Sequence, residues 1–194
     1  MNISQAEAAS ALRDVDAATA RTIEMRAYGY ASPHLILWGL IWIVGYALMG
    51  ALPQKDWGWI WLPLDLAGIV GSVMLGQRSR RMKAAAGSAT GSGTGPGMGT
   101  MMAVMLFVVL FVFAVYAVFA PTTPEPYLVF PAMVVGLVYV AAGAWKMPRL
   151  ALVGAAVFAL SVAGFLFLKP HLAYWIAAVG GGGLVLGGLW LRNV

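Results

Sequence analysis

Six long apolar stretches constrain the fold of this chain more than any other feature. A helix of about 20 apolar residues crosses the hydrocarbon core of a bilayer, whereas a barrel strand needs about half that length. The chain has 194 residues, 61% hydrophobic and 10% charged, which is far from the composition of a soluble domain. We therefore predict an all-α integral membrane bundle of six transmembrane helices. The stretches are Pro33–Leu52, Trp57–Gly76, Met101–Ala120, Tyr127–Trp145, Leu150–Leu168 and Leu172–Leu191.

The connections after the third stretch are short and cannot continue a helix. Three prolines fall within Pro121–Pro126, and only Lys146–Arg149 and Lys169–His171 separate the stretches that follow. Short links favour antiparallel neighbours. We expect two groups of helices, residues 33–76 and residues 101–191, joined by a longer segment over residues 77–100.

Basic residues predict the orientation of the bundle. If all six stretches span the membrane, Lys55 and Lys169 alone fall on one side, and every other lysine and arginine falls on the opposite side. Since cytoplasmic loops are enriched in these residues, both termini are expected in the cytoplasm, with the chain in a bacterial inner membrane. The net charge of +5 is then a topology signal, and we expect no nucleic acid partner.

Residues 1–30 have the pattern of a cytoplasmic amphipathic helix. Ser4 and Glu7 have capping-box spacing, and apolar residues then recur on one helical face. We expect this helix to end near Gly29, with Ser32 and Pro33 starting the first span. Two interpretations stay open, since residues 1–28 could lie on the membrane surface or bind a partner protein. The apolar residues are Ala8, Leu12, Val15 and Ile23.

Residues 77–100 combine a basic cluster with a flexible loop. Residues 84–100 are rich in glycine, serine and threonine, which is typical of a flexible coil. The cluster before them suits anionic lipid head groups, although a simple stop-transfer anchor explains it as well. Its members are Arg78, Arg80, Arg81 and Lys83.

Asp65 is the only aspartate, glutamate, lysine or arginine inside a predicted span. It follows Trp57 by eight positions, which places it about 12 Å below the outer interface. An intramembrane carboxylate is costly and is a candidate functional group. It could bind a proton or cation, fix helix packing as a hydrogen-bonded carboxyl, or lie nearer the interface than its position implies. By depth, the expected site around Asp65 and Pro63 contains three donors, Tyr46, Trp42 and Ser161.

Four consecutive glycines, Gly180, Gly181, Gly182 and Gly183, interrupt the last apolar stretch. Small residues allow membrane helices to approach closely, so tight packing is one explanation. A locally broken helix whose carbonyls bind an ion is the other. A short resemblance between residues 39–43 (GLIWI) and residues 136–140 (GLVYV) hints at an inverted repeat of three-helix halves.

The sequence offers little for enzyme chemistry. It contains no cysteine, and its two histidines, His34 and His171, fall at opposite membrane faces. We therefore expect no enzymatic activity, no cofactor and no metal. The leading hypothesis is a non-enzymatic partner, regulator or sensor subunit acting through its cytoplasmic helix. The alternative is a small permease or channel with a proton- or cation-linked site around Asp65, for which the short spans would require a homo-oligomer.

Overall fold

The computed structural model describes residues 5–85 and 98–193, and within these ranges the chain is helical with no strand. The prediction of an all-α chain is confirmed. The helices and helical turns, in chain order, are α1 (Gln5–Ala51), η1 (Gln54–Asp56), α2 (Trp57–Ala85), α3 (Met98–Phe119), α4 (Glu125–Lys146), α5 (Pro148–Phe167), η2 (Lys169–His171), α6 (Leu172–Ile176), η3 (Ala177–Gly181) and α7 (Gly182–Arg192).

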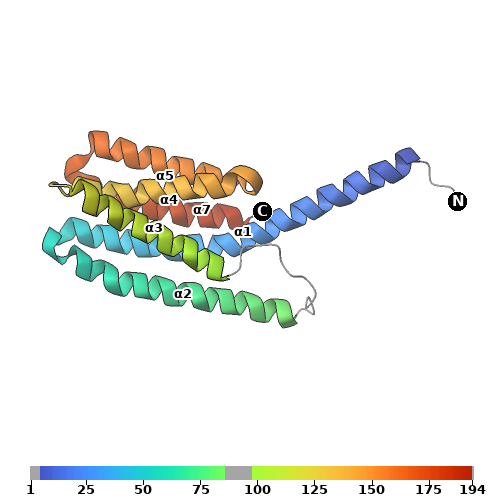
Figure 1. Cartoon of the computed structure of the whole chain (residues 1–194), viewed down its shortest axis with the longest axis horizontal. Coiled ribbons are helices and arrows are strands. Elements are labelled where there is room, and N and C mark those ends of the chain that lie inside the picture. Colours follow the sequence, from blue (N-terminus) through green and yellow to red (C-terminus); the bar gives the residue numbers. More distant parts are fainter. Residues whose placement is uncertain (1–4, 86–97, 194) are drawn as a thin grey trace.

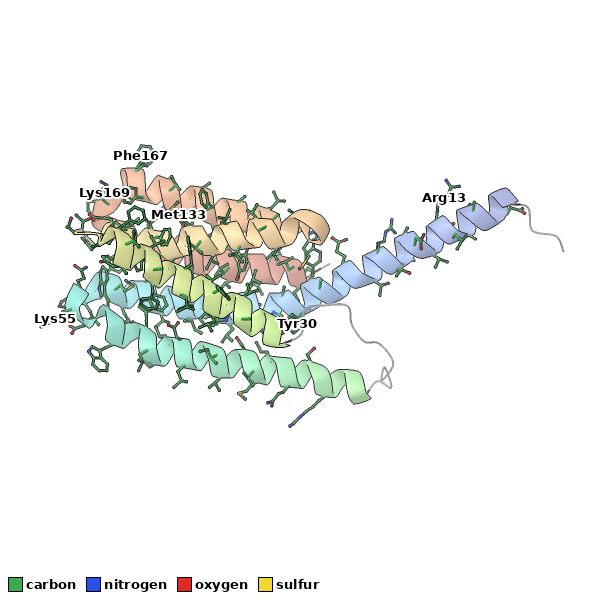
Figure 2. The ribbon with its side chains drawn as sticks, viewed as in Figure 1. Arg13, Tyr30, Lys55, Met133, Phe167 and Lys169 are labelled. Atoms are coloured by element: carbon green, nitrogen blue, oxygen red, sulfur yellow. The ribbon has the colours of Figure 1, made fainter. Side chains whose placement is uncertain are left out.

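Five helical segments are long and apolar enough to cross a membrane. These segments are Ala9–Ala51, Gln54–Ser79, Glu125–Ala144, Pro148–Phe167 and Lys169–Arg192. In α3 the segment Ala103–Phe119 is apolar but shorter, so a sixth span stays a prediction. Figure 2 shows Lys55 and Lys169 at the same end of the bundle, away from Arg13 near the N-terminus. That placement is compatible with the predicted orientation.

Helix α1 lies at the centre of the contacts in the bundle. It packs against α2 on one side and against α6, η3 and α7 on the other, while α4 and α5 form a closely packed pair (Figure 1). Helix α3 contacts mainly α4, where Tyr116 and Tyr127 stack with ring centroids 4.6 Å apart. Most other described α3 side chains are exposed.

The expected break at Gly29 and Pro33 is wrong, because α1 runs without interruption from Gln5 to Ala51. A proline inside a helix removes one hydrogen bond and costs about 3 kcal/mol. Contacts with the bundle on either side of Gly29 oppose that cost, since Tyr28 and Ser32 are only 1% and 3% exposed. The N-terminal part of α1 therefore extends the buried helix as a projecting rod (Figure 1).

Helices also occupy both ends of the predicted flexible segment. Helix α2 continues beyond Gly76 to Ala85, and α3 begins at Met98, so residues 86–97 of that segment alone lie outside the described residues. The basic cluster is thus on the last turns of α2. Arg78 and Arg81 are exposed there, and the side chains of Arg80 and Lys83 lie outside the description.

Candidate functional site

An aromatic cluster packs in the interface between the C-terminal part of α1 and the N-terminal part of α2. The Tyr46 ring makes edge contacts with Trp42, at 5.5 Å between centroids, and with Trp61, at 5.3 Å. Trp42 and Tyr46 are one helical turn apart, so they share the face of α1 that is turned inward. The Trp61 indole donates to the sulfur of Met49 (3.1 Å), and the Trp57 indole donates to the Met49 carbonyl (3.1 Å).

Asp65 lies one turn beyond Trp61, beside this cluster but not beneath it. Its side chain is exposed, and Tyr46 is near enough for the charge on Asp65 to act on it. Within the described ranges no ion pair neutralises the carboxylate. Pro63, inside α2, is exposed as well. The predicted site is therefore open along the flank of the α1–α2 interface.

A second polar contact continues this flank toward the C-terminal end of α2. The Trp38 indole donates to the Ser72 hydroxyl (3.2 Å), and Trp38 covers Gly68, where a β-carbon would lie 2.7 Å from the indole ring. Ser72 is two turns from Asp65, on the same side of α2. We call Trp38, Tyr46, Asp65 and Ser72 the α1–α2 polar flank. Sequence reasoning missed the Trp38–Ser72 pair, although the seven-residue spacing of Asp65 and Ser72 indicated a shared side.

Ser161 and Trp42 do not act as donors to Asp65. Ser161 is fully buried in α5, and its hydroxyl has no hydrogen-bond partner. One turn away on either side of it, Val157 contacts Gly183 and Gly164 faces the indole of Trp175, so Ser161 is turned toward the last helix. The Trp42 ring packs against Gly180 and Tyr46.

The four glycines fall where the last helix widens into a π turn. Gly180 and Gly181 belong to η3, and a β-carbon on Gly181 would lie 2.7 Å from the backbone nitrogen of Ile43 and 2.8 Å from the carbonyl oxygen of Gly39. By contrast, Gly182 has open space around it, and a β-carbon on Gly183 would make only an ordinary van der Waals contact with Val157, at 3.5 Å. The helix stays wound through this region, and Gly181 allows the backbones of α1 and η3 to touch.

The two similar five-residue segments make the same kind of contact. A β-carbon on Gly154 of α5 would meet the Gly136 carbonyl and the backbone nitrogen of Val140, just as one on Gly181 would meet those of Gly39 and Ile43. The partner helices do not correspond in sequence order. Helix α1 packs against the last helix of the chain, whereas α4 packs against the helix that follows it, α5. The resemblance therefore describes a shared packing motif, and the contacts do not follow a three-helix repeat.

Two grooves on the bundle are lined by apolar residues. One, of about 390 Å³, lies between α5 and α7, and the other, of about 530 Å³, lies between α3 and α4. Neither includes a residue of the α1–α2 polar flank. Their chemistry suits acyl chains better than an ion or a polar solute.

No family model matches this chain, and no curated protein or solved structure matches it significantly. Residue chemistry alone must then indicate function. In the part of the chain that the structure describes, no group of three or more potential ligands could hold a metal ion. His34 interacts within its own helix, where its Nδ1 lies 2.9 Å from the carbonyl oxygen of Tyr30 in the preceding turn.

Proposed function

We propose that this chain is a non-enzymatic subunit of the bacterial inner membrane that regulates, senses or assembles with a partner protein through its N-terminal helix. The observation that carries the proposal is the continuity of α1. One helix of 47 residues leads from a projecting rod into the most contacted position of the bundle. We define the rod as residues 5–27.

The rod has exposed apolar side chains, and some of its polar side chains form hydrogen bonds within the rod itself. Leu12, Val15 and Met25 are 65%, 62% and 50% exposed, respectively, and no other helix covers them. The hydroxyls of Thr19 and Thr22 donate to backbone carbonyls one turn earlier, so neither needs a tertiary partner. Short helices are marginal in water on their own, but this one extends a helix that is already packed. Its side chains are thus available to another molecule.

A compact joint links the rod to two other helices. The Ser32 hydroxyl donates to the Gly188 carbonyl of α7 (2.7 Å), and the backbone N–H of Arg149 donates to the Tyr28 hydroxyl (3.4 Å). The Arg149 guanidinium in turn lies 5.2 Å from the centre of a Trp190 ring. A tilt of the rod would therefore act on α5 and α7 together. We call these five residues the rod joint.

Site-specific photo-crosslinking in cells tests the proposal. A photoreactive residue at Leu12 or Val15, on the apolar side, should yield a protein adduct of discrete mass. Ser10 and Arg21 are exposed on the opposite side and provide matched controls. Adducts with lipid alone would favour a helix that lies on the membrane surface. Equal adducts from both sides, or no protein adduct, would contradict partner binding.

A permease or channel around Asp65 is the alternative proposal, and the exposure of this side chain to its surroundings is the observation that favours it. Because the chain has no cysteine, Asp65→Cys would be the only thiol. Rapid reaction with a membrane-impermeant reagent added from outside would mean that water reaches this position. Labelling only after denaturation would count against a permeation path.

A further inference from the structure

Inside a bilayer, a charged Asp65 carboxylate would need a positively charged partner or contact with water. It lies about 12 Å along α2 from Trp57, and its side chain is exposed on the surface of the bundle. Insertion scales put an aspartate near the centre of a transmembrane helix at about 2.5–3.5 kcal/mol, so such residues pair or line a wet cavity. Neither described groove reaches Asp65. Because the side chain is exposed on the surface of the bundle, a partner for the carboxylate can reach it from outside.

The surroundings of Asp65 form a surface where another helix could pack. Among the described helices α2 contacts chiefly α1, which leaves the remaining side of α2 uncovered. Leu62 and Leu66, beside Asp65, are 67% and 61% exposed. Beside the carboxylate on this flank lies the hydrogen-bonded Trp38–Ser72 pair, whereas Tyr46 is buried at 1% exposure and does not reach the surface. Apolar area with one central acid is suited to recognition inside a membrane.

A second copy of this chain cannot supply the complementary charge. No lysine or arginine occurs in any of the six predicted spans, so a homodimer through this surface would bring two acids together. Like charges at close range in a low dielectric repel strongly. The charge complement therefore belongs to a different protein.

We propose that the α1–α2 polar flank binds a transmembrane helix of another protein that carries a lysine or arginine at the depth of Asp65. This inference rests on the proposed function as a partner subunit and adds an intramembrane contact to it. The apolar residues of α2 would supply packing area, and the pairing of Asp65 with the basic side chain would supply selectivity.

The test uses the full chain in lipid vesicles with a designed single-span helix of leucine and alanine. One probe helix carries a lysine at its midpoint, and its control carries leucine there. Energy transfer from the probe to a dye on Gln54→Cys, an exposed position in a chain without other thiols, measures association. We expect the lysine probe to bind about tenfold more tightly than the leucine probe, a difference of about 1.4 kcal/mol.

Two variants separate this site from a general attraction between opposite charges in lipid. Asp65→Asn should abolish the preference for lysine. In that background, Ala67→Asp places an acid at an exposed position only about 3 Å further along α2 but about 200° around it, away from the proposed surface, and it should not restore the preference. Restoration by Ala67→Asp would overturn the proposal, as would equal binding of the two probes by the unaltered chain.

Self-association would also overturn it. Energy transfer between two labelled copies that depends on Asp65 would show that a second copy occupies this surface. None of these results would alter the rod crosslinks, so failure of this inference and failure of the proposed function are distinguishable.

Discussion

Gly181→Ala should separate α1 from the last helix of the bundle. The added β-carbon would lie 2.7 Å from both the backbone nitrogen and Cγ1 of Ile43, and 2.8 Å from the carbonyl oxygen of Gly39. Ordinary van der Waals contact begins near 3.4 Å, so the two backbones would have to move apart by several tenths of an ångström. Gly181 has helical torsion angles (φ −65°, ψ −51°), so alanine introduces no strain of its own.

The magnitude follows from two opposing effects. Overpacking a close contact typically costs about 1–3 kcal/mol. Alanine also gains up to about 1 kcal/mol over glycine in helix propensity. Gly182→Ala supplies the matched control, because the neighbouring position has open space and changes propensity alone. We expect Gly181→Ala to be less stable than Gly182→Ala by about 1–3 kcal/mol.

The assay is reversible unfolding of the purified chain in mixed micelles by a denaturing detergent, followed by tryptophan fluorescence. The quantity compared is the free energy of unfolding of the two variants. Equal stability of Gly181→Ala and Gly182→Ala would refute the close contact between α1 and η3. Greater stability of Gly181→Ala would refute it even more strongly.

Four further substitutions test three other sites. Ser32→Ala removes the hydrogen bond to Gly188 and should lower the free energy of unfolding by about 1 kcal/mol, measured in the same micelles; no loss would count against the rod joint. Ser161→Ala removes a buried hydroxyl without a partner and should raise stability by about 1–3 kcal/mol, so a loss would reveal a bound water or a hydrogen bond. Trp38→Phe should lower the free energy of unfolding by about 1 kcal/mol without red-shifting the fluorescence of the remaining tryptophans. Adding Ser72→Ala to that variant should lower it little further, whereas additive losses would mean that the two side chains do not interact.

Helical segments could be predicted from sequence because long apolar stretches dominate the pattern of this chain. The six stretches each coincide with a helical run, although the ends of α1 and α2 extend further. The break at Gly29 and Pro33 was predicted from local propensity. Tertiary contacts of Tyr28 and Ser32 outweigh that propensity, and no local pattern contains them. Boundaries set by packing could not be predicted from residue spacing.

The candidate site shows the same division. Asp65 could be identified because it is the one aspartate, glutamate, lysine or arginine in a predicted span. Depth alone grouped Ser161 with it, but depth does not specify which way a residue faces or which helices are neighbours. The structure turns Ser161 toward the last helix and places Ser72 and Trp38 on the flank with Asp65. The π turn at Ala177–Gly181 is likewise a property of packing.

The central claim, that the rod and the core of the bundle are one continuous helix, can be measured as a distance. Spin labels at Leu12→Cys and Leu40→Cys, both at exposed positions, are 28 residues apart in a chain without other thiols. An unbroken helix gives a narrow distribution centred at about 42 Å. A variant with three glycines inserted after Gly29 provides the broken-helix reference. A broad, shorter distribution for the unaltered sequence, matching that reference, would contradict the claim.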